Sequence, residues 1–130
     1  MPYWADATYL IGLMDGKDQW HAQARELHER VGRRNTLRIH ALAVAEVVTR
    51  LAATVGYEKA QDAYFVIRDS MDLRFPGEQD LDDAMDLVVR FEGELSLSDS
   101  LFVHWMAPRD IVLSFDAGFD GKVKRLPARE

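Results

Sequence analysis

The fold is decided by Ser96-Leu-Ser-Asp-Ser-Leu-Phe-Val-His-Trp-Met-Ala-Pro-Arg-Asp-Ile-Val-Leu-Ser-Phe-Asp-Ala-Gly-Phe119. Its first half predicts a short helix over about residues 98–106, and its second half a buried strand over about residues 111–114. Asp99 stands at the start of that helix, and Asp116 follows the strand. Carboxylates in these two positions can share one cation, so we ask which other acids of the chain reach the same place.

Around this segment, short strand patterns alternate with amphipathic helical patterns. Further strands are expected at about residues 3–5, 37–40, 73–75 and 123–126, and further helices at about residues 7–14, 18–31, 41–55, 57–71 and 80–92. This alternation predicts an α/β fold, a three-layer α/β/α sandwich with a central, mainly parallel sheet of four to five strands. A length of 130 residues is typical of one domain, residues 1–130. Ligands of such sheets bind beyond the carboxyl ends of the strands.

The composition narrows the possible chemistry. The chain has no cysteine, which excludes disulfides, thiolate nucleophiles and cysteine-ligated metals, and which is typical of a cytoplasmic protein. We find neither a signal peptide nor an apolar run of about 20 residues, so no membrane association is expected. A net charge of -6 argues against a broad nucleic-acid surface. Local basic clusters nevertheless offer candidate phosphate contacts, at Lys122, Lys124, Arg125, Arg33 and Arg34.

Two acids upstream are candidates for the same site. Asp6 directly follows the first strand, where α/β proteins present functional side chains, but it is equally suited to capping the helix that begins at Ala7. Glu46 lies in a helix that is otherwise strongly apolar. It either forms an exposed pair with Arg50, four residues on, or turns inward toward a cation.

Asp99 and Asp116 also have structural alternatives. Ser96 and Asp99 match a capping box, and Asp116 matches an Asx turn before Gly118. Neither role conflicts with a site, because both keep the carboxylate at the end of an element. Four carboxylates that converge repel one another and have raised pKa values. A hard divalent cation, Mg²⁺ or Mn²⁺, relieves that repulsion and suits oxygen ligands.

The order of these short motifs resembles that of the PIN-domain nucleases. The matching segments are Asp6-Ala-Thr8 with Leu10, Ala45-Glu46-Val47, Leu97-Ser-Asp-Ser100 and Ser114-Phe-Asp-Ala-Gly-Phe119. The short single-domain form is similar to VapC-type toxins of toxin–antitoxin pairs. By this resemblance, Asp6, Glu46 and Asp99 match the invariant acids and Asp116 the more variable fourth, as metal-binding and catalytic groups. Thr8 and Ser114 match small hydroxyl positions that line the site.

The resemblance implies an endoribonuclease that requires Mg²⁺ or Mn²⁺, acts as a homodimer and is inhibited by a cognate antitoxin in a type II toxin–antitoxin system. Two alternatives stay open: a PIN-domain RNA-processing nuclease outside a toxin pair, and a non-catalytic module that binds a cation or a basic peptide. A phosphatase with an aspartate nucleophile is disfavoured because position 8 is threonine rather than a second aspartate.

Several aromatic residues are assigned to packing. Trp20 and Trp105 are expected to be packing or interface residues rather than platforms for nucleobases. Tyr64 and Phe65, with Ile67, are expected to pack in the core, with a dimer interface as the alternative.

Overall fold

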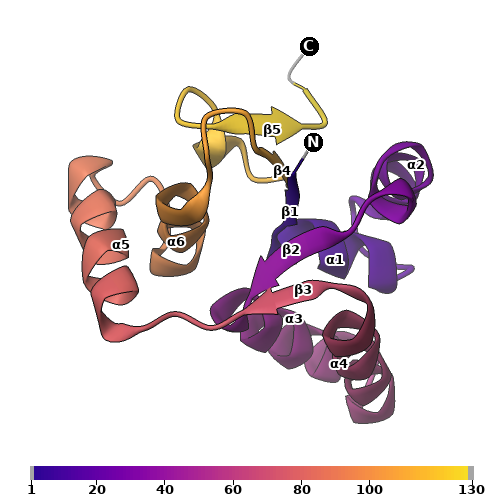
Figure 1. Ribbon diagram of the computed structural model, residues 1–130. Coiled ribbons are helices and arrows are strands. Elements are labelled where there is room, and N and C mark those ends of the chain that lie inside the picture. Colours follow the sequence, from indigo (N-terminus) through magenta and orange to yellow (C-terminus); the bar gives the residue numbers. More distant parts are fainter. Residues whose placement is uncertain (1, 129–130) are drawn as a thin grey trace.

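The computed structural model describes residues 2–128 and contains a five-stranded, entirely parallel sheet (Figure 1). The strands are β1 (Tyr3–Ala5), β2 (Leu37–His40), β3 (Asp72–Arg74), β4 (Ile111–Leu113) and β5 (Lys124–Leu126). Their order across the sheet is β3-β2-β1-β4-β5. The predicted α/β class and strand number are therefore confirmed.

Within residues 2–128, six α-helices connect the strands and form the outer layers of the sandwich. They are α1 (Ala7–Met14), α2 (His21–Arg30), α3 (Ala41–Thr54), α4 (Tyr57–Ser70), α5 (Glu78–Arg90) and α6 (Leu97–Trp105), with two short 3₁₀ helices, η1 (Gly32–Arg34) and η2 (Ala117–Phe119). The pair α5 and α6 lies on one side of the sheet, and α1 to α4 pack against one another on the other (Figure 1). None of the helices described is long and apolar enough to cross a membrane.

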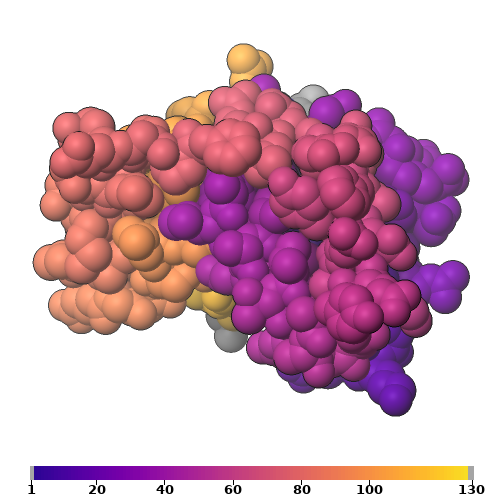
Figure 2. Space-filling view, turned by 90° about the horizontal axis from the view of Figure 1, so that it is seen from below, coloured from indigo at the N-terminus to yellow at the C-terminus, as the bar shows by residue number. Residues whose placement is uncertain are grey.

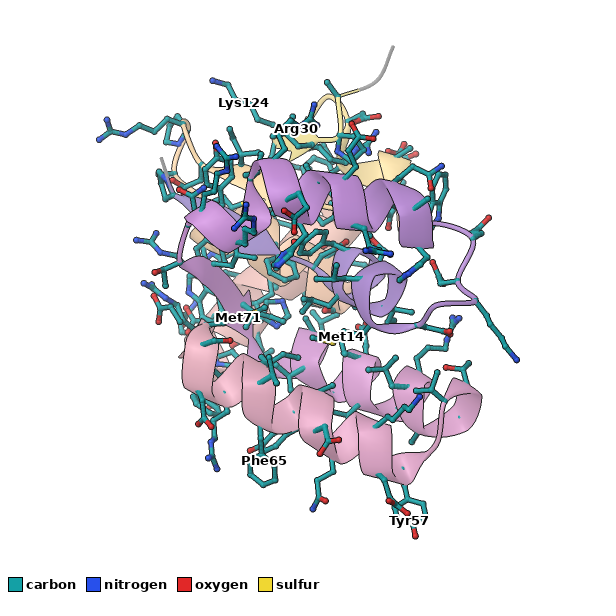
Figure 3. All side chains as sticks on the ribbon, turned by 90° about the vertical axis from the view of Figure 1, so that its right-hand side faces the viewer. Met14, Arg30, Tyr57, Phe65, Met71 and Lys124 are labelled. Carbon is teal, nitrogen blue, oxygen red and sulfur yellow. The ribbon has the colours of Figure 1, made fainter. Side chains whose placement is uncertain are left out.

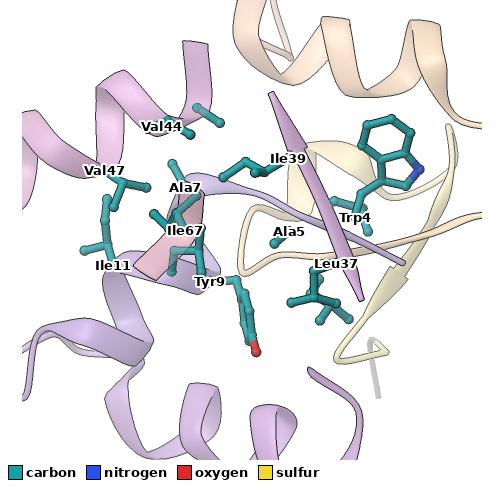
Figure 4. Packing of buried hydrophobic residues seen from close by; sticks show 14 of the residues in the cluster. Trp4, Ala5, Ala7, Tyr9, Ile11, Leu37, Ile39, Val44, Val47 and Ile67 are labelled. Carbon is teal, nitrogen blue, oxygen red and sulfur yellow. The ribbon is translucent and has the colours of Figure 1, made fainter. Parts of the chain in front are cut away.

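The core lies on both faces of the sheet. On one face, Trp4 packs edge-on against Phe102 of α6, with ring centroids 6.1 Å apart. On the other, aliphatic side chains of β2, α1, α3 and α4 meet, among them Ile39, Val47 and Ile67 (Figure 4). Burying such side chains stabilises the fold by about 1.5–3 kcal/mol each. The sheet is therefore a rigid base for the groups at its edge.

One expectation about the core is wrong in part. Ile67 is fully buried, but Tyr64 and Phe65 are 38% and 39% exposed. Both lie on α4, which packs beside α3 on the face seen in Figure 2, and Phe65 projects from the outer side of α4 (Figure 3). A helix covered on one side only leaves its remaining apolar residues in solvent.

The strand order explains where a site can form. From β1 the chain moves outward through β2 to β3, then crosses back to place β4 on the opposite side of β1. β1 and β4 are thus neighbours at the switch point of the sheet. Their ends are joined directly, since the Asp6 amide donates to the Leu113 carbonyl at 3.2 Å. Residues that leave these two strands therefore meet.

Candidate active site

Asp6 is a fully buried carboxylate held by three donors. Its Oδ1 accepts from the Tyr9 amide at 3.0 Å and from the Thr8 hydroxyl at 2.7 Å. Its Oδ2 accepts from the Ser114 hydroxyl at 2.5 Å. The first of these bonds caps α1, so the capping role and the site role are both present in one side chain. Thr8 and Ser114 lie against the acid, where the sequence placed them.

Asp99 lies on the first turn of α6, where the helix dipole favours a negative charge. Ser96 caps this helix by accepting from the Asp99 amide at 3.1 Å, as the capping-box pattern predicts. The start of α6 is tied to β2 through His40, whose Nε2 lies 2.9 Å from the Ser98 carbonyl oxygen. The other ring nitrogen of His40 accepts from the Ala43 amide at the start of α3. His40 therefore fixes α6 relative to α3.

Asp116 leaves β4 in a tight turn. Its Oδ1 accepts from the Gly118 amide at 2.8 Å, which confirms the Asx turn, and its own amide donates to the Ser114 hydroxyl at 2.9 Å. A Cβ atom on Gly118 would lie 2.9 Å from the Glu94 carbonyl oxygen, so only glycine fits here. Arg125 supports the turn from β5 by donating to the Ser114 carbonyl at 3.0 Å.

Glu46 reaches the site from α3 but is exposed. It lines a groove of about 560 Å³ between α1 and α3, together with Thr8 and Arg50. No ion pair joins Glu46 to Arg50 in the part of the chain that the structure covers. The exposed-pair interpretation is therefore not supported, and Glu46 instead adds negative charge near Asp99.

The electrostatics show that the acids lie close enough to interact. Burial raises the pKa of Asp6 to about 6, although its three hydrogen bonds act in the opposite direction. The pKa of Asp99 is raised to about 8 by burial first, and then by the charge of Asp6, a hydrogen bond with Asp116 and the charges of Asp116 and Glu46. The raised pKa values of Asp6 and Asp99 show that the surroundings of both carboxyls disfavour their charged forms.

The donor set suits a hard cation, but a complete cage is absent. No group of three or more His, Asp or Glu side chains within residues 2–128 is arranged to hold a metal ion. Mg²⁺ commonly binds through one or two carboxylates and keeps several waters. The oxygen-only chemistry and the raised pKa of Asp99 fit that mode of binding.

Four of the five basic candidates are engaged within the protein. Lys122 bonds the Glu94 carboxylate at 2.6 Å and the Gly118 carbonyl at 2.9 Å. The Arg125 side chain is 9% exposed and pairs with Asp120. Arg33 and Arg34 are exposed but also have partners: Arg33 pairs with the Glu29 carboxylate at 2.9 Å, and the Arg34 side chain donates to the Glu29 carbonyl at 3.2 Å. Lys124 is exposed as well.

Sequence reasoning passed over the supporting roles of His40, Gly118 and Arg125. The role of His40 could have been inferred from its position directly before an apolar helix, where a histidine can act as the N-cap. The glycine of the Asp-Ala-Gly motif was a signal for the second, since close backbone approach commonly requires glycine. Nothing in the sequence around Arg125 indicated its role, which depends on the pairing of β4 with β5.

Comparisons with known proteins establish the fold. No family model matches the sequence, and no curated protein matches it. Among solved structures, Mycobacterium tuberculosis VapC20, a sarcin–ricin loop cleaving toxin, superposes with a TM-score of 0.81 at 20% identity over 94% of this chain and 97% of that one.

Two further solved structures are similar. VapBC-1 from nontypeable Haemophilus influenzae gives a TM-score of 0.66 at 15% identity, over 96% of each chain. VapBC2 from Rickettsia felis, bound to a DNA fragment from its promoter, gives 0.64 at 13% identity, over 96% of this chain and 97% of that one. This chain therefore has the PIN-like α/β/α fold of the VapC toxins. Because one fold hosts many functions, the activity has to be argued from the site.

Proposed function

We propose that this chain is a PIN-domain endoribonuclease that requires Mg²⁺ or Mn²⁺ and acts as the toxin of a type II toxin–antitoxin pair. The observation that carries the proposal is that Asp6 and Asp116 meet through the Ser114 hydroxyl at the ends of β1 and β4, close enough to Asp99 for their charges to act on it. A cluster of uncompensated acids at a strand switch point is costly unless it serves a cation or a proton transfer. The fold shared with VapC20, a toxin that cleaves RNA, supports the same substrate class.

The residues divide the work as follows. Asp6, Glu46 and Asp99 would hold the principal cation, and Asp116 would bind a second one or orient the attacking water. When bound, the cation supplies positive charge against the phosphate and activates water. Thr8 and Ser114 keep Asp6 in one orientation through the two hydroxyl bonds described above. Asp116, which lies within hydrogen-bond reach of Asp99, would accept the proton that an attacking water loses.

An antitoxin is the proposed protein partner. An apolar groove of about 270 Å³ lies between α3, α4 and β3, lined by side chains that include Val44, Val48, Tyr64 and Phe75. Phe75 is 73% exposed, which is unusual for a ring of this size and is typical of a docking site. An amphipathic antitoxin helix fits such a groove.

We also propose a homodimer in solution, which light scattering on the purified chain tests.

Cleavage of RNA by the purified chain tests the proposal. We expect Mg²⁺ or Mn²⁺ to support cleavage, chelation to stop it, and Asp6→Ala or Asp99→Ala to reduce the rate by more than about 100-fold. Asp86→Asn, which removes an exposed acid of α5, is the matched control and should cleave normally. Activity that survives both substitutions, or that needs no metal, would contradict the proposal. The toxin assignment further requires that the product of a neighbouring small reading frame bind the chain and stop cleavage.

A further inference from the structure

We propose that Trp20 and Phe115 form a stacking platform for a base of the RNA strand whose phosphate lies at the four acids. This inference rests on the proposed function and adds to it the groups that bind the bases of the substrate. The sequence expectation that Trp20 is only a packing residue would then be incomplete.

The two rings form an open, flat surface. Their centroids are 5.0 Å apart, and their planes differ by only 3°. Trp20 is 36% exposed, so one side of the indole rests on Phe115 while part of the ring stays in solvent. Nucleobases stack on aromatic rings in this parallel, offset manner.

The platform is attached to the site by backbone and side-chain bonds. Phe115 lies between Ser114 and Asp116, and its amide donates to the Thr8 hydroxyl at 2.8 Å. That hydroxyl in turn donates to Asp6, so the ring is two hydrogen bonds away from the buried carboxylate. The ring therefore belongs to the same turn that carries Asp116 toward the site.

Trp20 itself is held in place. Its amide donates to the Asp18 carboxylate at 3.0 Å, directly before the first turn of α2. Its Cβ also packs against the glycine of α1, since a Cβ atom added at Gly12 would lie 3.4 Å from it. A platform that is fixed before binding loses little conformational entropy when a base arrives.

The other tryptophans show what a packing role looks like in this protein. Trp4 is buried, and its indole nitrogen donates to Asp110 at 3.0 Å. Trp105 stacks on Trp4. For the indole nitrogen of Trp20, by contrast, the covered residues supply no hydrogen-bond partner, and the ring has no place in the buried core.

Charge gives a further reason for a stacking contribution. The chain carries a net charge of -6, and Lys122 and Arg125 near the acids are already paired. Phosphate contacts alone would therefore bind RNA weakly at physiological salt. A base stacked on an aromatic ring contributes about 1–3 kcal/mol without any phosphate contact.

Binding to RNA that cannot be cleaved tests the platform. The protein is Asp99→Asn, and the probe is a fluorescein-labelled oligoadenylate of about 12 nucleotides, followed by anisotropy. A ribose-phosphate oligomer of the same length without bases is the second probe. We expect Trp20→Ala to weaken oligoadenylate binding about 5- to 100-fold, to leave binding of the base-free oligomer unchanged, and to be largely rescued in Trp20→Phe.

Phe65→Ala is the matched control, because Phe65 is a ring of similar exposure on the outer side of α4 (Figure 3). It should bind both probes as the parent does. The platform is refuted if Trp20→Ala binds oligoadenylate normally, or if it weakens both probes equally, which would indicate a structural defect. If the wild-type chain cleaves no RNA while the base-dependent loss is seen, the proposed function fails and the platform stands. If the wild-type chain cleaves RNA and Trp20→Ala binds oligoadenylate normally, the proposed function stands and the platform is refuted.

Discussion

Replacing Asp99 by asparagine should stabilise the metal-free protein and remove most of its loss of stability at high pH. The pKa of Asp99 is raised from 3.8 to about 8, so between these values the folded state binds more protons than the unfolded chain. Its stability therefore falls as the pH rises through this window. Asparagine keeps the shape of the protonated acid and carries no charge at any pH.

The size of the effect follows from the same shift. A tenfold change in an acid dissociation constant corresponds to about 1.4 kcal/mol, which sets an upper limit of roughly 5–6 kcal/mol above pH 8. Asp99 is partly exposed, and its neighbours can move apart or take up the proton, so water screens part of the repulsion. We expect the variant to gain about 1–3 kcal/mol at high pH and little near pH 4.

Urea unfolding in the presence of a chelator, followed by circular dichroism at several pH values, measures this difference. Asp86→Asn removes an exposed charge and should change stability by less than about 0.5 kcal/mol. Adding Mg²⁺ should raise the midpoint of the wild type and not that of Asp99→Asn, since only a cation bound to the folded state stabilises it. A variant no more stable than wild type at high pH, or one with an unchanged pH profile, would refute the argument.

Three further substitutions test the supporting groups. Gly118→Ala should destabilise the fold by about 1–3 kcal/mol and impair RNA cleavage, because its Cβ would lie 2.9 Å from the Glu94 carbonyl oxygen; urea unfolding and cleavage rates measure both. Arg125→Gln should leave Asp120 short of its bidentate partner and lower kcat more than it raises KM, as steady-state kinetics would show. Burial lowers the pKa of His40 to about 4, so the stability that neutral His40 contributes is lost as the pH falls from its ordinary 6.5 toward 4. His40→Gln should lower the free energy of unfolding at neutral pH by about 1–3 kcal/mol. In urea titrations it should also reduce the dependence of that free energy on pH between 6.5 and 4.

The sequence was sufficient for the fold because its patterns are local. Strand and helix periodicity, the Ser96 cap and the Asx turn at Asp116 each depend on residues a few positions apart. The boundaries of α5 (residues 78–90 rather than 80–92) and β3 (72–74 rather than 73–75) were displaced, as expected where caps rather than apolar residues set the ends.

The parts that escaped prediction depend on contacts between distant segments. The exposure of Phe65 depends on which side of α4 faces α3, and the helical pattern alone does not specify it. The stacking of Trp20 on Phe115 joins residues 95 positions apart, and the pairing of Arg125 with the β4 turn requires the order of the sheet. Asp6 and Asp116 were recognisable because they follow strands, and Asp99 because it lies at the start of a helix. The supporting roles of His40 and Arg125 were not, because these side chains reach the site from other elements.

The two central acids differ in a way that burial alone does not explain. Asp6 is more buried than Asp99, yet its pKa is raised only to about 6 against about 8. Asp6 has three hydrogen-bond donors that favour its charged form, whereas Asp99 faces other acids. The protein's own hydrogen-bond donors therefore stabilise the negative charge of Asp6. The negative charge of Asp99 is instead opposed by its neighbours, and a bound proton or cation would relieve that repulsion. We expect the pH dependence of metal binding to follow Asp99, so that substitution of Asp99 shifts it more than substitution of Ser114, whose hydroxyl contacts Asp6 and the Asp116 amide but carries no charge.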